Sequence, residues 1–203
     1  RFNLSEFSYR DDRAVADRFT EELPVITYDW IAQPLGKTPW DTPIVVDLAT
    51  EIGERRSDYD DRLGFRISDR TLRTDQLVEV SAPFHLGAFY VRPFLSTRGT
   101  FYDNTVQGGS EGRVAWTTGV QIGTRLSRTW SWSGDGEQNG VRHVIAPKIS
   151  VLDRFHVDDR ASEFFPFDEV DTLGEEQLVR VELRNLLQTM EKTERGRQPR
   201  DFV

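Results

Sequence analysis

Hydrophobic and polar residues alternate with a period of two along much of the chain, the pattern of β-strands with two different faces. The clearest run covers residues 113–127. One set of alternate positions holds Val114, Trp116, Thr118, Val120, Ile122, Thr124 and Leu126, and the other holds Arg113, Ala115, Thr117, Gly119, Gln121, Gly123, Arg125 and Ser127. Helical spacing does not produce this pattern, so we predict a strand with one apolar and one polar face.

Other segments alternate in the same way, though less regularly. Together they predict about eight strands, at residues 2–9, 24–33, 43–53, 76–83, 88–101, 113–132, 140–153 and 177–189. Several exceed the about 5–6 residues of an average globular strand and reach the about 9–11 residues that cross a bilayer. We therefore predict an all-β, antiparallel up-and-down meander: a curved open sheet that is a segment of a large outer-membrane β-barrel.

The predicted connections alternate between long and short. Outer-membrane barrels have this rhythm because their periplasmic turns are short and their extracellular loops are long. Turn sequences such as Gly108-Gly109 and Asn139-Gly140 lie in or beside the connections. No linker separates two domains, so we expect residues 1–203 to form part of one barrel domain. The chain starts at Arg1 without a signal peptide, and we expect a mature or internal fragment.

Composition is compatible with such a barrel. The mean hydropathy is −0.55, and no run of about 18 apolar residues predicts a membrane helix. Strands that alternate between lipid and lumen have a low average hydropathy. The absence of cysteine excludes disulfides, thiolate metal ligands and cysteine nucleophiles. The net charge of −8 argues against a nucleic-acid partner.

The sequence carries no recognisable catalytic or cofactor motif. His85, His143 and His156 lie in separate segments without metal-ligand spacing, and His143 is expected to be hydrogen-bonded or interfacial because it falls on an apolar face. Three acids in one segment lack the glycine and terminal glutamate of a calcium loop, and we interpret them as a solvated acidic loop. They are Asp58, Asp60 and Asp61. We predict neither an enzyme nor a metal or cofactor site.

Basic residues are concentrated on the polar faces of the predicted strands, whereas much of the acid lies in connections, above all in residues 154–176. The predicted lumen-facing basic residues are Arg92, Arg98, Arg113, Arg125, Arg142, Lys148, Arg180 and Arg184. A basic interior suits the passage of a phosphorylated, anionic amphiphile. In the alternative interpretation these residues pair across strands with Asp47, Glu51 and Glu182.

Aromatic residues cluster near the predicted strand ends, as in the girdles of membrane barrels, although packing in a soluble β core is an alternative. These residues are Tyr28, Trp30, Trp40, Phe101, Tyr102, Trp130 and Trp132.

A series of short motifs gives a more specific indication. In chain order they are Glu22-Leu23-Pro24, Pro34-Leu35-Gly36, Arg73 with Asp75, Leu77 and Pro83, Pro93, Thr100-Phe101-Tyr102, the strand from Arg113 to Trp130, the R-H-x-I-x-P pattern of Arg142 to Pro147, Phe167 to Asp171, Leu178, and Asn185-Leu186-Leu187. Over nearly the whole chain this order resembles the C-terminal barrel domain of the LptD family of lipopolysaccharide-assembly proteins, also called OstA.

The resemblance implies a transport function in the bacterial outer membrane and no catalysed reaction. Barrels of this family receive lipopolysaccharide from a periplasmic Lpt bridge, reached through an N-terminal jelly-roll that this sequence lacks. They release it into the outer leaflet through an opening between their first and last strands, and an LptE-like lipoprotein plugs the lumen. The implied partners are thus lipopolysaccharide, the plug, the bridge and outer-membrane lipids. The family's barrel has far more than eight strands.

Two other interpretations stay open. A different outer-membrane β-barrel, such as a porin, would be supported by a constriction loop that folds inward. A soluble β-sandwich or carbohydrate-binding module would have a similar strand pattern without the membrane.

Overall fold

The computed structural model is all-β and describes residues 2–11, 18–59, 68–134, 137–193 and 196–202. The strands are β1 (Phe2–Asp11), β2 (Arg18–Lys37), β3 (Pro43–Tyr59), β4 (Ser68–Ser81), β5 (Phe84–Leu86), β6 (Phe89–Tyr102), β7 (Glu111–Thr124), β8 (Leu126–Gly134), β9 (Glu137–Val157), β10 (Glu176–Thr193) and β11 (Gly196–Phe202). The one helical element among the described residues is a 3₁₀ turn at Ala161–Glu163. No helix of the described residues is long and apolar enough to span a membrane.

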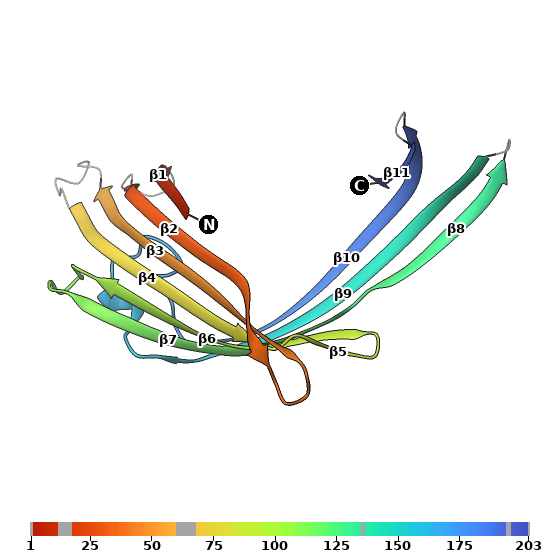
Figure 1. The fold of residues 1–203 in the computed structure, drawn as a ribbon. Helices are drawn as coiled ribbons and strands as arrows, with labels where there is room; N and C mark the ends of the chain where they lie inside the picture. Colours follow the sequence, from red (N-terminus) through yellow and green to blue (C-terminus); the bar gives the residue numbers. More distant parts are fainter. Residues whose placement is uncertain (1, 12–17, 60–67, 135–136, 194–195, 203) are drawn as a thin grey trace.

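The strands form a single antiparallel sheet in the order β1-β2-β3-β4-β6-β7-β9-β10-β11. Figure 1 shows that the sheet is strongly curved and open, with the first and last strands apart on two separate arms. The predicted antiparallel meander and curved open sheet are therefore confirmed.

Two of the strands are interrupted without a change of register. β5 continues β4 along β6, because Ser81 faces Phe94 and Phe84 faces Val91. β8 likewise continues β7 along β9, and the interruption lies across from Pro147. Proline donates no backbone hydrogen bond, so the ladder breaks there while β9 itself runs on. Eleven elements thus form nine strand positions, one more than the sequence predicted.

The additional strand and the strand boundaries have a common explanation. The apolar–polar alternation is weak in strand segments whose residues are mostly polar on both faces, and such segments were missed. β11 has the sequence GRQPRDF, which offers almost no apolar residue. β4 begins at Ser68 rather than at the predicted residue 76. Its first half was missed because it carries the polar residues Thr71, Arg73 and Asp75 on one face. These side chains are buried although they are polar.

Connections of different length lie at opposite ends of the sheet. Among the connections that the structure describes in full, residues 38–42 and 87–88 lie at one end. Residues 103–110 and 158–175 lie at the other end, and both are longer. The predicted alternation of long and short connections is therefore confirmed for these described connections.

The two faces of the sheet differ as the alternation predicts. Along β7, Arg113 and Ala115 are 2% and 4% exposed, whereas Val114 and Trp116 between and beside them are 38% and 37% exposed. The buried polar residues of the described chain outnumber the buried hydrophobic ones, and they include Arg55, Arg73, Asp75, Thr100 and Asp171. A soluble domain buries its apolar residues instead. Here the apolar face is exposed and the polar face is partly buried.

Candidate functional site

Strand register places all eight predicted basic residues on one face. Arg113 faces Thr100, Arg98 faces Ala115, and Arg92 faces Gln121; Lys148 faces Gly123 and Glu182. Arg142, Arg180 and Arg184 lie at the corresponding positions of β9 and β10. Arg125, between β7 and β8, follows the same alternation. We call the face that bears these residues the polar face, and the opposite face the apolar face.

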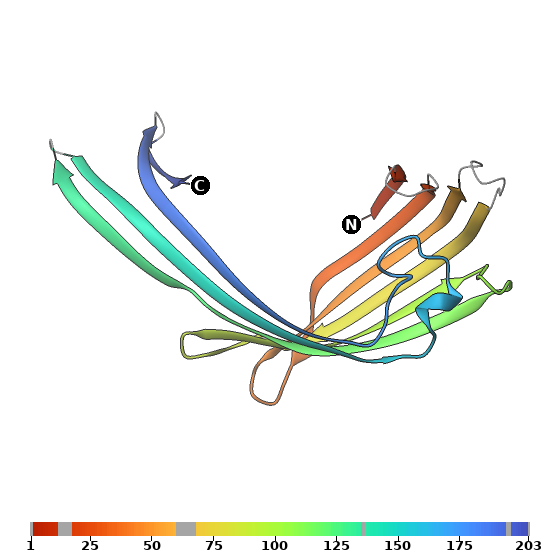
Figure 2. The same ribbon diagram turned by 180° about the vertical axis from the view of Figure 1, so that it is seen from behind.

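The connection between β9 and β10 folds back over this polar face. We call it the covering segment, residues 158–175. Figure 2 shows it lying across the strands of the β1–β7 arm. Hydrogen bonds from Arg73 and Arg113 of the strands to Asp168, Val170 and Asp171 fix it there. It thus packs against strands that precede it by up to about a hundred residues.

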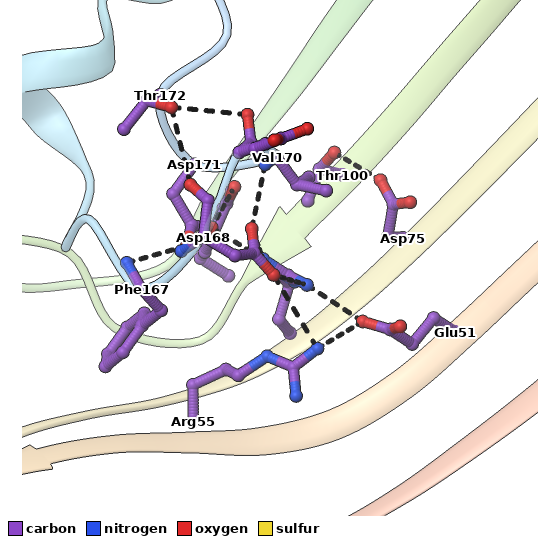
Figure 3. Close-up of polar contacts among 12 residues, drawn as sticks. Glu51, Arg55, Asp75, Thr100, Phe167, Asp168, Val170, Asp171 and Thr172 are labelled. Atoms are coloured by element: carbon purple, nitrogen blue, oxygen red, sulfur yellow. Dashed lines mark hydrogen bonds and ion pairs between the residues drawn. The ribbon is translucent and has the colours of Figure 1, made fainter. Parts of the chain in front are cut away.

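Arg73 of β4 is the centre of the contact with the covering segment, and Figure 3 shows its partners Glu51, Asp168 and Asp171. Its Nη1 and Nη2 donate to the two carboxylate oxygens of Asp168, each at 2.7 Å. Nη1 also donates to Asp171 Oδ1 at 2.8 Å, and Nη2 to Glu51 Oε1 of β3 at 2.8 Å. A guanidinium bound by both oxygens of one carboxylate forms the strongest and most directional kind of ion pair.

The side chain of Arg113 of β7 binds backbone carbonyl oxygens of the same covering segment. Its Nη1 donates to the carbonyl oxygen of Asp171 at 3.0 Å, and its Nη2 donates to the carbonyl oxygen of Val170. The guanidinium lies 4.7 Å from the ring centroid of Phe164. Tyr102 packs on that ring at 4.4 Å and donates its hydroxyl to Asp171 Oδ1 at 2.9 Å.

The covering segment has the local sequence needed for these contacts. Asp171 Oδ2 accepts hydrogen bonds from the backbone N–H groups of Phe167 and Asp168, at 2.9 and 3.0 Å. Asp168 Oδ1 accepts one from Val170 N–H at 2.8 Å. Aspartate side chains that bind nearby backbone N–H groups stabilise turns. The two carboxylates therefore shape the turn and also bind the arginines.

Charge balance explains how such a polar cluster is buried. Arg55, Arg73 and Arg113 are each 2% exposed, and a buried charge is tolerated only when it is paired. Arg55 pairs with Glu51 and lies 3.9 Å from Asp168 Oδ2. Burial raises the pKa of Asp168, but the hydrogen bonds and charge of Arg73 outweigh burial and hold that pKa below its ordinary value.

No protein-family model, curated protein or solved structure matches this chain.

The structure separates the eight predicted basic residues into different environments. Arg113 is buried beneath the covering segment. Arg92 pairs with Glu79 and Asp47, Arg98 with Asp75, and Lys148 with Glu182. The predicted alternative of cross-strand pairing is thus observed for Asp47 and Glu182. Glu51, the third expected partner, pairs instead with Arg55 and Arg73.

An open part of the polar face remains beside the covered one. A cavity of about 800 Å³ is lined by Arg125, Arg184 and the paired Lys148 and Glu182, together with His85 and Tyr90 of the β5–β6 hairpin. Arg142 and Arg180 are exposed on the same face. The structure therefore brings three of the eight residues together around one hollow, which an anionic group could enter.

The sequence did not indicate that the acids of residues 154–176 return to the strand arginines. Asp168 and Asp171 neutralise part of the basic face, and Arg55 was not singled out as a site residue. The available signal was the Phe167 to Asp171 motif, whose acids are spaced to form a turn. Nothing in the local pattern indicates which distant strand such a turn contacts.

A second acidic group lies where the covering segment meets β7. Carboxylate oxygens of Glu111, Asp159 and Glu163 lie within 4.8 Å of one another. Burial raises the pKa of Asp159, and the charges of Asp158 and Glu163 raise it further. Oxygen ligands of this kind could hold a hard divalent cation. The side chains of Asp58, Asp60 and Asp61 lie outside the described residues.

The aromatic residues expected at strand ends fall into two groups. Tyr28, Trp30, Phe101 and Trp130 are exposed on the apolar face, as a girdle requires. Tyr102 is 1% exposed beneath the covering segment, so its assignment to a girdle was wrong. Two more lie elsewhere: Trp40 is exposed in a turn, and the side chain of Trp132 lies outside the described residues.

Proposed function

We propose that this chain is a segment of a bacterial outer-membrane β-barrel of the LptD type, which takes part in lipopolysaccharide transport and insertion into the outer leaflet. The observation that carries the membrane assignment is the open apolar face. Large hydrophobic side chains are exposed on it from β2 to β10, among them Ile26, Trp30, Ile52, Val80, Leu95, Trp116, Ile122, Ile149, Val181 and Leu183. Exposed apolar patches of such extent mark contact with a membrane or a partner.

The height of the apolar face supports a bilayer. On β9 the apolar positions Ile145, Pro147, Ile149 and Val151 lie between two polar residues, His143 and Asp153. Ten residues advance about 33 Å at about 3.3 Å per residue. A strand tilt of about 40° reduces this to roughly 25 Å along the membrane normal, the height of the apolar band of outer-membrane barrels.

A soluble β-sandwich is disfavoured by the same observation. A sandwich covers the apolar face of each sheet with a second sheet. In the described residues there is one sheet, and the segment that packs on it covers the polar face. An apolar face without cover is unstable in water, whereas lipid would solvate it.

The arrangement of the LptD-like motifs supports the more specific assignment. Arg73 and Asp75, Tyr102, Arg113, and Asp168 with Asp171 come from four separate motifs. In space they form one hydrogen-bonded group: Tyr102 and Arg73 both bind Asp171, and Arg113 binds its carbonyl oxygen. Asp75 accepts from Thr100, the residue across from Arg113. Chance matches would not be expected to converge in this way.

The basic cavity supports an anionic substrate. Arg125, Lys148 and Arg184 lie on the part of the polar face that the covering segment leaves open. In a closed barrel this face would be the lumen, where phosphorylated sugars of lipopolysaccharide could pass and a lipoprotein plug could bind. The proposed partners are accordingly lipopolysaccharide, an LptE-like plug, the periplasmic Lpt bridge and outer-membrane lipids.

One observation favours a porin-like barrel as a second candidate. The covering segment lies across the polar face, as expected of a constriction loop that narrows a pore. A porin would conduct ions through the space beside it, and the paired charges around Arg92 and Arg98 would line the passage.

Membrane fractionation followed by depletion tests the proposal. We expect the full-length protein in the outer membrane, and its depletion to leave newly made, pulse-labelled lipopolysaccharide out of the outer leaflet. Recovery in the soluble fraction would contradict the membrane assignment. Normal lipopolysaccharide export after depletion, together with stable ion conductance of the purified protein in planar bilayers, would favour the porin-like function instead.

A further inference from the structure

A polar and aromatic cluster interrupts the apolar face at one border of its apolar band. It consists of Arg128 and Trp130 of β8, His143 of β9 and Asn185 of β10, and we call it the border cluster. Arg128 and His143 are directly opposite each other in the β8–β9 ladder, and Trp130 faces Val141. These residues therefore share the apolar face with Ile145 and Ile149, and are separate from the polar face and its cavity.

The four side chains are held together across three strands. The Arg128 guanidinium lies 5.4 Å from the ring centroid of Trp130. The Trp130 and His143 rings stack at 6.2 Å with an interplanar angle of 25°. His143 Nε2 and Asn185 Oδ1 are 2.6 Å apart, which confirms the prediction of a hydrogen-bonded histidine. The cluster thus orients Arg128 on the outer surface of the sheet.

The charge of Arg128 is not neutralised by any described residue. No carboxylate of the described chain lies within ion-pair distance of it, in contrast to Arg70 on the same face, which binds Glu54 at 2.7 Å. Exposed Leu126 and Leu187 lie beside the border cluster on the same face. A guanidinium that projects beside apolar side chains needs a counter-charge, and a phosphate matches its planar donors.

We propose that the border cluster binds the phosphate of a membrane lipid headgroup. The inference rests on the proposed membrane location and adds a ligand site on the outer surface of the barrel. Arg128 binds the phosphate, and the rings of Trp130 and His143 pack against the glycerol region. The acyl chains lie along Leu126, Leu187 and the band beyond them. Tryptophan prefers this interfacial depth because it has an apolar body and one N–H donor.

The occupant is a lipid rather than a free anion because the cluster is surrounded by apolar surface. A free phosphate would lose hydration against these leucines without a compensating contact. A lipid phosphate is already placed at this depth by its acyl chains, so its binding costs less.

Native mass spectrometry of the full-length protein in maltoside micelles tests the site. The protein is titrated with short-chain dihexanoyl phosphatidic acid, with inorganic phosphate, and with uncharged dihexanoylglycerol. We expect phosphatidic acid to bind the unmodified protein and Arg128→Gln to weaken binding about tenfold, the effect of losing one hydrogen bond to a charged group. Arg128→Lys should restore part of the affinity, since it keeps the charge but not the planar fork.

Arg70→Gln is the matched control, because Arg70 lies on the same face with its charge already paired. It should bind phosphatidic acid like the unmodified protein. Equal binding by Arg128→Gln would overturn the site, and so would equal binding of dihexanoylglycerol, which would show an apolar contact only. Competition by inorganic phosphate at the same concentration would overturn the lipid assignment.

Membrane fractionation separates a failure of the lipid site from a failure of the proposed function. If the full-length protein is found in the outer membrane and Arg128→Gln binds normally, only the lipid site is wrong. If the protein is found in the soluble fraction, the membrane location is wrong and the lipid site fails with it.

Discussion

At the scale of single residues, the unusual feature is a group of arginines in the most buried part of the sheet. Arg55, Arg73 and Arg113 are buried as completely as any apolar residue of the described chain. Their guanidinium groups are bound by Glu51, Asp168 and Asp171 or by backbone carbonyls. A buried charge that loses its partner is costly, so stability depends on keeping both members of each pair.

Replacing Arg73 should therefore destabilise the folded protein strongly. Arg73→Met leaves Asp168, Asp171 and Glu51 without their shared partner, and an uncompensated buried charge costs roughly 3–5 kcal/mol. Urea unfolding of the full-length protein in lipid vesicles measures the loss. Arg70→Gln, which removes an exposed pair worth at most about 1 kcal/mol, is the control. A loss for Arg73→Met no larger than for Arg70→Gln would contradict the importance of the cluster.

The attachment of the covering segment should also depend on pH. Arg73 holds the pKa of Asp168 below its ordinary value of 3.8. A lowered carboxyl pKa stabilises the folded state fully above the unfolded value, and this contribution is lost as pH falls through the folded pKa. Asp171 and Glu51 face the same guanidinium and Arg55 lies nearby. Asp159, whose pKa is raised, acts in the opposite direction.

Protease protection of residues 158–175 in the folded protein should thus stay constant from neutral pH down to about 4 and disappear at lower pH. Limited digestion with proteinase K near neutral pH and with pepsin in acid measures it. Asp168→Asn should shift the loss of protection to neutral pH, because the amide cannot neutralise Arg73. Protection that persists at pH 2 in the unmodified protein would show that the segment is held by packing alone.

At the scale of elements, the strands carry an apolar face and a face that bears the charged residues. Val120 lies on the apolar face of β7 across from Val151, and its neighbour Gln121 lies on the polar face across from Ser150. The same substitution at these two adjacent positions therefore tests which face of the sheet contacts lipid. Gly119 is unsuitable, since a Cβ there would lie 2.5 Å from the carbonyl oxygen of Val151.

Val120→Arg should impair folding into a membrane, while Gln121→Arg should be tolerated. Arginine on the lipid side costs roughly 2–4 kcal/mol near the midplane and little in an aqueous lumen. Folding of both full-length variants into vesicles, followed by heat-modifiable mobility on gels, measures the difference. If Val120→Arg folds normally and Gln121→Arg does not, the polar face is the one that contacts lipid.

At the scale of the whole molecule, the sheet is open, and β1 and β11 each lack a neighbour on one side among the described residues. Unpaired strand edges invite aggregation in water and are not tolerated in lipid. The polar face also carries more charge than the filled interior of a narrow barrel would accommodate. A wider barrel that includes further strands resolves both problems.

Residues 1–203 by themselves should therefore not yield a closed, transport-competent barrel. We expect aggregation or failure to fold when they are diluted from urea into detergent. Gel mobility with and without heating, combined with limited proteolysis, gives the measurement. A protease-resistant, heat-modifiable monomer with cross-links between β1 and the last strands would instead demonstrate a complete small barrel.

The sequence by itself determined the strand content, the antiparallel order and the identity of the two faces. Alternation fixes these because consecutive side chains of a strand point to opposite sides, whatever the strand contacts elsewhere. It also put all eight basic residues of the predicted site on a single face. The prediction missed β11 and the first half of β4, and it ended several strands too early: β2, β3, β9 and β10 all extend beyond their predicted bounds.

Only the tertiary structure decided which of those charges are available. Asp168 lies 95 residues from Arg73 in the chain, and their pairing follows from the path of the covering segment over β3, β4, β6 and β7. No periodic pattern encodes that path, because a turn such as Phe167 to Asp171 has the same local sequence wherever it docks. The fold thus buries Arg73 and Arg113 beneath the covering segment and leaves Arg125 and Arg184 beside an open cavity, where Lys148 is paired with Glu182.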